Sequence, residues 1–299
     1  MLLRRAHEMH ARHLRALRRS EETVRFYHQA VTDLERHMER EKLAPELENV
    51  TRGILIMCQA DMTARGMRDG AIAAYMRGLR GFFSWALEED LIERNPMRKM
   101  PVPSPSGEPP AAIQPHEVQA CLAVVKAGAQ PRRDTAILTL LYDTGLRLGE
   151  VCGLRVGDVS VETGMLTVRG ETSKTSARVV PLGIRSARAL MRYMHRERRP
   201  ALPTVEEVFL SKAGTPLTHS GVSQLLNRVA EGAGLPRDHV APHAWRRGFA
   251  VQALRNGADL FTVQTILGHS TLAMTRRYVR YLPTDIQRSH LRASPADRL

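Results

Sequence analysis

Histidine, arginine and tyrosine side chains gather in two short stretches near the C-terminal end of the sequence. The stretch PHAWRRGFA holds His243 and Arg246, three residues apart and therefore on one face of a helix. The stretch LGHSTLAMTRRYVRY holds His269 and, nine residues later, Tyr278 directly behind two arginines. Imidazoles that move protons, guanidiniums that bind anions and a phenol that can attack phosphorus are the groups needed to cut a phosphodiester.

Cleavage of a phosphodiester by side chains alone has definite requirements. The transition state concentrates negative charge on the non-bridging oxygens, so fixed cations should flank it, and arginine can bind two of these oxygens at once. The attacking group needs a proton acceptor, and the departing 5′ oxygen needs a proton donor. A side-chain nucleophile that forms a covalent intermediate would conserve the energy of the broken bond.

Two further cations stand earlier in the sequence. Arg147 lies in TGLRLGEV, after a glycine turn, and Glu150 follows it by one helical turn. Lys174 lies in ETSKTSARVVPL, at the tip of a predicted hairpin, from which a long side chain can reach over a substrate.

Taken singly, each of these side chains also has a plain structural interpretation, and only their joint order and spacing favours a site. The structural alternatives are a surface charge for Arg147, a solubilising turn residue for Lys174, helix caps for His243 and His269, and packing for Tyr278, with Tyr281 as the competing functional tyrosine.

The charge of the chain favours a polyanionic partner. Its formal net charge is +13 over 299 residues, with an isoelectric point near 10.4. Residues 1–20 hold six Arg against one Glu, and residues 101–299 hold 26 Lys and Arg against 16 Asp and Glu. Nucleic acid is the commonest partner of such a chain, and a solvated basic surface is the structural alternative.

Several classes of protein are not indicated. The sequence contains no GxGxxG, GxxxxGK[ST], GxSxG or HExxH pattern and no CxxC pair, so we expect no cofactor and no metal. Its three cysteines are far apart, as is typical of reduced thiols in a cytosolic protein. No apolar run approaches the roughly 18 residues of a membrane span. We expect a cytoplasmic, nucleoid-associated protein with no membrane contact.

These residues need elements to position them, and a proline-rich segment divides those elements into two groups. Residues 96–115 hold seven of the 17 prolines and predict a semi-rigid linker. Residues 1–95 predict an all-helical domain with a basic N-terminal arm. Its His7, His10 and His13 recur every three residues and are expected on a solvated helix face, with metal binding as the alternative. Two helices are expected at 20–40 and 68–94; their buried stripes are Val24, Tyr27, Val31, Leu34 and Met38, and Ile72, Tyr75, Leu79, Phe82 and Phe83.

Residues 116–299 predict a second, mostly helical domain with a small antiparallel sheet. The β-branched runs MLTVRG and ARVVPL form the expected strand pair, and EVFLS is a further expected short strand. The expected helices cover residues 116–127, 133–143, 184–196, 219–231, 243–256, 259–267 and 272–280. The fold class is therefore mainly α, or α+β.

Over nearly its full length the chain resembles the tyrosine recombinases, the family of phage integrases and Xer-like site-specific recombinases. The resemblance rests on TGLRLGEV, on the His243 and Arg246 pair, on LGHS and on RRYV, and on the intervals of 96, 23 and nine residues between them. Two features depart from the family pattern: Arg247 replaces its usual second histidine and Trp245 an apolar residue. The alignment of Lys174 needs a one-residue adjustment.

The resemblance implies a role for each residue. Tyr278 would be the nucleophile that takes the 3′ phosphate, and Arg147 and Arg246 would clamp the scissile phosphate. The remaining implied roles are general acid for Lys174, proton acceptor for His243, a phosphate hydrogen bond for His269, orientation of the site for Glu150, and DNA contacts for Arg276, Arg277, Arg77 and Arg80.

The resemblance also implies an architecture and partners. A helical, SAM-like core-binding domain and a catalytic domain would clamp double-stranded DNA at recombination sites. A homotetramer on DNA would act through a Holliday junction, as in integration by mobile genetic elements, without metal or ATP. A monomer in solution and an accessory DNA-bending protein are both compatible with the sequence. The alternatives are nicking and closing of one duplex, as by a type IB topoisomerase, and a non-catalytic DNA-binding protein on the same fold.

Overall fold

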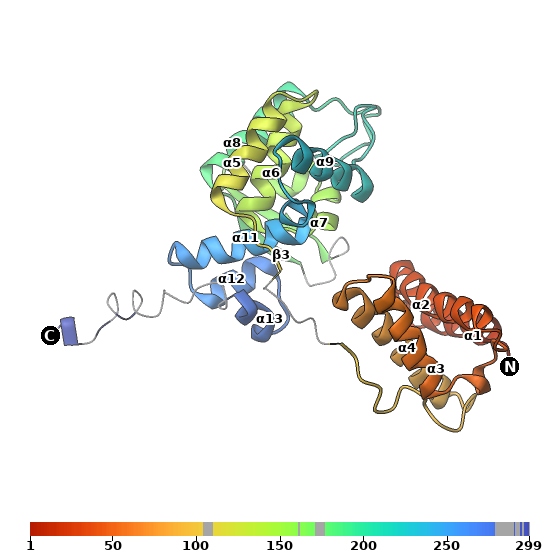
Figure 1. Cartoon of the computed structure of the whole chain (residues 1–299). Coiled ribbons are helices and arrows are strands. Elements are labelled where there is room, and N and C mark those ends of the chain that lie inside the picture. The colour runs from red at the N-terminus through yellow and green to blue at the C-terminus, as the bar shows by residue number, and fades with distance from the viewer. Residues whose placement is uncertain are drawn as a thin grey trace. The chain divides into compact units, whose positions relative to one another are not determined.

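The chain divides into two compact units, Met1–Glu108 and Pro109–Leu299, and each unit has a hydrophobic core of its own (Figure 1). This computed structural model describes residues 1–103, 110–160, 162–170, 177–278, 290, 294 and 296–298. In that part of the chain no helix combines the length and the apolar character needed to cross a membrane.

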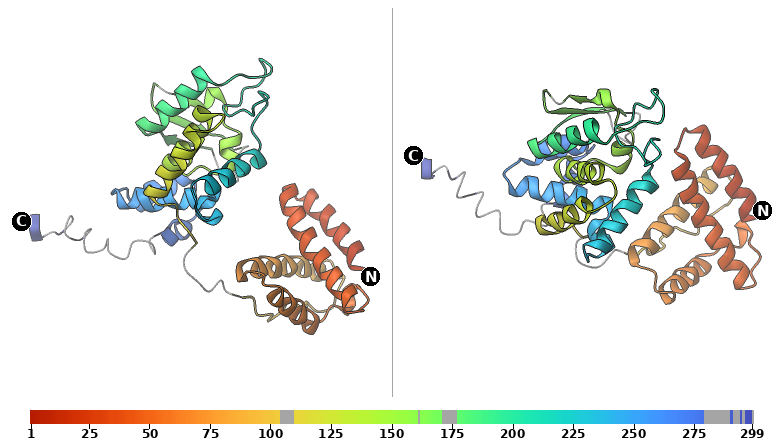
Figure 2. Two further views of the ribbon diagram at one scale, coloured as in Figure 1. Left: turned by 45° about the horizontal axis from the view of Figure 1, so that its top comes forward. Right: turned by 90° about the horizontal axis from the view of Figure 1, so that it is seen from above.

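The first unit is a bundle of four α-helices, drawn from red to orange in Figure 2. Ser20 ends the turn before the second helix, and its hydroxyl accepts a hydrogen bond from the Thr23 amide at 3.3 Å, as expected of an N-cap. The two predicted stripes face the core, where only Tyr27 is partly exposed. The elements are α1 (Leu3–Ala16), α2 (Glu21–Arg40), η1 (Leu47–Asn49), α3 (Arg52–Ala64) and α4 (Asp69–Glu88).

Two expectations for this unit were wrong. The helix expected to run to residue 94 ends at Glu88, because Asp90 has a φ of 54° and the Leu91 amide donates to the Ala86 carbonyl at 2.9 Å. The face of α1 that carries His7 and His10 was expected to be solvated, but it is the buried inner face of the helix. His7 and His10 are 9% and 3% exposed, because α1 packs on α2 and α4 as part of the bundle.

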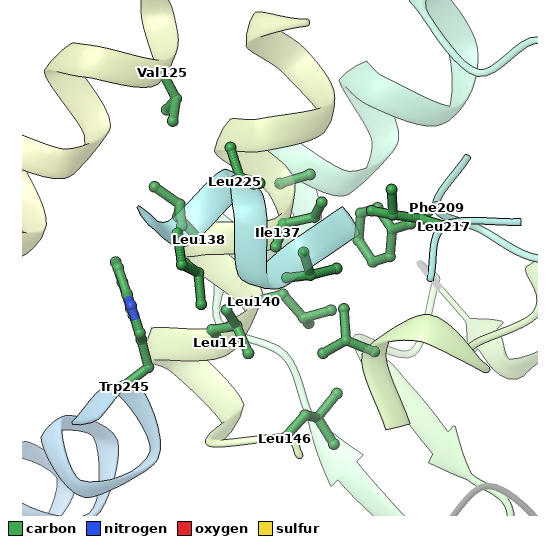
Figure 3. Packing of buried hydrophobic residues seen from close by; sticks show 14 of the residues in the cluster. Val125, Ile137, Leu138, Leu140, Leu141, Leu146, Phe209, Leu217, Leu225 and Trp245 are labelled. Atoms are coloured by element: carbon green, nitrogen blue, oxygen red, sulfur yellow. The ribbon is translucent and has the colours of Figure 1, made fainter. Parts of the chain in front are cut away.

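The second unit is built around α6, which packs against α5, α8 and α11. Figure 3 shows Ile137, Leu138 and Leu141 of α6 in the centre of the core, with Val125, Leu225 and Trp245 reaching it from other helices. The helical elements are α5 (Pro115–Lys126), α6 (Pro131–Thr144), α7 (Leu148–Cys152), η2 (Val156–Asp158), α8 (Ile184–Arg196), α9 (His219–Gly232), α10 (Arg237–Val240), α11 (Pro242–Arg255), α12 (Leu260–Leu267), α13 (Leu272–Arg276) and η5 (Ala296–Arg298).

The antiparallel strand pair is confirmed, and the sheet has one more short strand than expected. Strands β1 (Val159–Ser160), β2 (Met165–Val168) and β3 (Arg178–Pro181) are joined in that order. Leu166 lies opposite Val180, and both are fully buried. The strand expected at residues 207–211 was wrong. Only isolated bridges occur there, and the Leu210 amide donates to the Tyr193 hydroxyl instead of to a neighbouring strand.

The described ends of the proline-rich segment are attached to different units. Met97 and Met100 are buried in the first core, and Arg80 donates to the Met100 carbonyl at 3.0 Å. Ile113 is buried in the second core, and Arg247 donates to the Ala111 carbonyl at 2.6 Å. Arg247, which stands where the family more often has histidine, therefore holds the start of the second unit.

Candidate active site

Arg147 is placed by a tight turn between α6 and α7. Gly145 ends α6 with a φ of 60°, and a Cβ atom on it would lie 2.6 Å from Phe249 Cδ1 and 2.7 Å from Leu267 Cδ2. Only glycine therefore fits this position without strain. Arg147 precedes α7, where its amide donates to Glu150 Oε2 at 2.8 Å and its Nη1 donates to Glu150 Oε1 at 3.0 Å.

Glu150 is shared by two arginines. It is 2% exposed, and Arg178 at the start of β3 donates to both of its carboxylate oxygens, at 2.9 and 2.8 Å. The Nε of Arg178 donates to the Ile266 carbonyl at 2.7 Å, near the end of α12. Arg178 thus connects β3, α7 and the end of α12. Glu150 therefore holds two guanidiniums in fixed positions relative to each other.

Arg246 on α11 is held between the two turns that precede Arg147 and His269. It is 6% exposed; its Nη1 donates to the Gly145 carbonyl at 2.6 Å and its Nη2 to the Leu267 carbonyl at 2.5 Å. Burial, and next the charge of Arg147, lower the pKa of Arg246 to about 10, so it remains a cation at neutral pH.

His269 follows Gly268, which ends α12 in the left-handed conformation with a φ of 61°. Its Nδ1 is hydrogen-bonded to the hydroxyl of the fully buried Thr275 at 2.8 Å. Burial, followed by the charges of Arg246 and Arg147, lowers the pKa of His269 to about 4. The ring is therefore neutral at pH 7, and its Nε2 can bind a ligand.

Tyr278 lies beside these groups. Its ring is 6.0 Å from the His269 ring between centroids, with an interplanar angle of 25°, and it packs on the small cluster formed by Phe249, Val263 and Leu267. The phenolate form of Tyr278 would favour the Arg246 cation, so Tyr278 opposes the lowering of the Arg246 pKa by burial and by Arg147. The phenol is thus within electrostatic range of a guanidinium in the same subunit.

His243 lies one turn before Arg246 on α11 and is exposed. Partial burial of the ring lowers its pKa, and the charges of Arg247, Arg246 and Arg147 lower it further. A neutral imidazole at this position is able to accept a proton.

The other predicted residues are exposed or lie outside the described residues. Lys174 lies outside the described residues. Arg276 and Arg277 are exposed at the end of α13, and the Arg277 charge contributes to the lowered pKa of His269. Arg77 and Arg80 are exposed on α4 of the first unit.

Sequence reasoning missed two residues of the cluster, Arg178 and Thr275. The strand register contained a signal for the first, because Arg178 pairs with the buried Val168 and cross-strand partners share one face of a sheet. An arginine on the core side of a strand needs a buried anion, which here is Glu150. Within the described residues no group of three or more His, Cys, Asp or Glu side chains is arranged to bind a metal.

Comparisons with known proteins agree with this geometry. The model of the phage integrase family matches residues 111–284. Tyrosine recombinase XerC of Anoxybacillus flavithermus is 31% identical over 278 residues, which cover 91% of this chain and 90% of that protein. Tyrosine recombinase XerD of Xanthomonas campestris pv. campestris is 34% identical over 232 residues, which cover 75% of this chain and 71% of the relative.

Solved structures share the fold. The Tn1549 transposon integrase, in complex with transposon right end DNA, superposes with a TM-score of 0.80 at 21% identity and covers 98% of this chain and 99% of that one. A lambda integrase dimer bound to a COC′ core site gives a TM-score of 0.73 at 19% identity and covers 92% and 97%. The chain therefore belongs to the phage integrase family, the tyrosine-type site-specific recombinases.

Proposed function

We propose that this recombinase cuts and rejoins double-stranded DNA through a covalent 3′-phosphotyrosyl intermediate on Tyr278. The observation that carries the proposal is the position of Arg246. This one buried guanidinium bonds the turns before Arg147 and His269 and lies within electrostatic range of Tyr278.

In the cleavage step the Tyr278 Oη attacks the phosphorus, and the bond from phosphorus to the 5′ oxygen breaks. Arg147 and Arg246 hold the non-bridging oxygens, on which the negative charge grows, and the neutral His269 donates a hydrogen bond to one of them. His243 takes the phenolic proton, and Lys174 protonates the departing 5′ oxygen. The assignment of Lys174 rests on the sequence resemblance.

In the joining step these transfers run in reverse. A 5′ hydroxyl, from the same or a partner strand, attacks the phosphotyrosine and releases Tyr278. Since the covalent intermediate conserves the bond energy, the reaction needs no ATP. Exchange between two recombination sites in a homotetramer gives a Holliday junction, and the DNA-bound relatives support duplex DNA as the substrate.

A nicked suicide duplex, selected from a sequence library by binding to the protein, tests this proposal. We expect a protein–DNA adduct that survives denaturant, absent with Tyr278→Phe although that variant still binds DNA. A protein that binds the duplex but never forms an adduct would be a non-catalytic DNA-binding module. Relaxation of a single supercoiled plasmid without any exchange between two sites would favour topoisomerase action.

A further inference from the structure

The outer face of α8 carries a row of arginines that the proposed chemistry does not use. Arg185, Arg188, Arg192 and Arg196 recur at intervals of three and four residues, so they lie on one face of the helix, and all four are exposed. The opposite face, with Leu190 and Tyr193, is buried. The row is about 16 Å long at 1.5 Å per residue.

Among the described residues, the acidic groups at the ends of α8, Asp143 and Glu197, are hydrogen-bonded to groups outside the row. The sequence of α8 contains no Asp or Glu, and in the described parts of the chain none of its four arginines forms an ion pair. Arg198, just beyond the helix, behaves differently: it donates to the backbone carbonyls of Val205 and Glu207. The row is therefore a positive surface, whereas the Arg198 side chain stabilises the backbone at Val205 and Glu207.

The chemistry of the row matches a DNA backbone. Duplex DNA presents one phosphate per roughly 3.4 Å along each strand, so a 16 Å row faces about four or five phosphates of one strand. Arginine binds phosphate oxygens through a planar fork, and counterions released from the DNA favour such contacts.

The row lies on the side of α8 that is not packed against the core of the second unit. The buried face of α8 packs on α6, and α11, which carries Arg246, packs on α6 as well. In Figure 1, α8 lies in the upper part of the second unit, and α12 and α13 lie at its lower end. Short DNA resists bending, so one short straight duplex at the lower end of the unit is not expected to contact α8 as well.

We propose that the α8 arginine row (Arg185, Arg188, Arg192 and Arg196) binds the backbone of a second DNA duplex while the catalytic cluster holds the first. This contact is sequence-independent and gathers DNA around the subunit. It rests on the proposed function only in taking duplex DNA as the substrate.

A bridging assay tests this proposal with a bead-bound 25-base-pair duplex, saturated with the full-length protein, and a free fluorescent duplex of the same length. The variant replaces all four arginines by Gln, which keeps the helix and the exposure of its face. We expect wild type to capture the free duplex, and the variant to capture at least tenfold less per bead-bound protein at 100 mM salt. The slope of log affinity against log salt for the second duplex should fall by roughly three to four, about 0.9 per lost contact.

The controls separate this surface from general charge and from catalysis. Replacing the exposed Arg4, Arg5, Arg12 and Arg19 of the first unit by Gln removes the same charge, and this variant should still capture the second duplex. The α8 variant should still form the suicide-substrate adduct, within about twofold of wild type. Equal capture by wild type and the α8 variant, or no capture by wild type at 50 mM salt, overturns the inference. Absence of the adduct in wild type instead overturns the proposed function.

Discussion

At the scale of single residues, the candidate site depends on a buried carboxylate that holds two arginines. Glu150 accepts hydrogen bonds from Arg147 and from Arg178, so the position of Arg147, the proposed phosphate-binding arginine, is linked to a strand and to the end of α12. Breaking a buried ion pair by removing one partner is costly because it leaves the other charge poorly compensated.

We therefore predict that Arg178→Met slows DNA cleavage by about 10²-fold, the effect of a misplaced catalytic group, and destabilises the protein by about 3 kcal/mol. Arg178→Lys keeps the positive charge but loses the bidentate contact with Glu150. We therefore expect it to restore the free energy of unfolding more fully than the rate of DNA cleavage. Single-turnover cleavage and thermal unfolding measure the two effects. A folded Arg178→Met variant that cleaves at the wild-type rate would refute this role.

The sequence alone predicted most of the residues that the structure brings together, because its residue types and intervals are specific. The structure brings Arg147, Arg246, His269 and Tyr278 into one cluster. Arg178 and Thr275 were missed because each takes its role from a tertiary contact, with Glu150 and His269 respectively. The buried His7 and His10 were misjudged for the same reason: a helix periodicity does not tell which face another helix will cover.

At the scale of elements, the turn between α6 and α7 sets the geometry of the site. The Gly145 carbonyl accepts the Arg246 guanidinium, and the space beside its Cα is filled by Phe249 and Leu267. The strand expected at residues 207–211 shows that composition alone does not predict where a strand forms. Its β-branched and aromatic residues are buried, but side-chain and isolated backbone contacts take the place of a ladder.

For this turn we predict that Gly145→Ala costs about 2–4 kcal/mol, the sum of a left-handed backbone and overpacking, and reduces cleavage at temperatures where the variant is folded. Gly164→Ala is the matched control: its φ is 65°, but its added Cβ would meet only the Leu182 carbonyl at 3.7 Å. That variant should lose only about 1 kcal/mol and cleave normally. Equal losses in the two variants would argue against a role for the packing at Gly145.

In the first unit, the contact of α1 with α2 and α4 should make stability depend on pH. Burial, and next the charge of His13, lower the pKa of His10 to about 4, below its ordinary value of 6.5. The unfolded state therefore takes up the proton first. The contribution of neutral His10 to the free energy of unfolding is fully present above pH 6.5. It is lost as the pH falls toward 4, and it amounts to about 3 kcal/mol.

We predict that His10→Phe, whose ring can keep the contacts with Phe82 and Trp85, removes this part of the acid destabilisation. Denaturant unfolding between pH 4 and 7, followed by Trp85 fluorescence in a Trp245→Phe background, measures it. The exposed His219→Gln should leave the pH dependence unchanged. The prediction is wrong if His10→Phe and its parent lose the same stability over this range.

At the scale of the whole molecule, two units with separate cores are joined by a proline-rich segment whose described ends are each held by an arginine, Arg80 in one unit and Arg247 in the other. The proline content and the helical character of both units followed from the sequence. The attachment of the segment to the two units could not be predicted from the sequence. The hydrogen bonds from Arg80 and Arg247 that hold its ends join residues 20 and 136 positions apart.

The central claim is that Tyr278 becomes covalently bonded to a 3′ phosphate of DNA. Its most direct test is peptide mapping by mass spectrometry of the adduct formed on a nicked suicide duplex, with each strand end labelled separately. We predict a nucleotide attached to the peptide that contains Tyr278, through the 3′ phosphate, with a free 5′ hydroxyl on the released strand. A nucleotide attached to another residue such as Tyr281, or a linkage through a 5′ phosphate, would contradict the account.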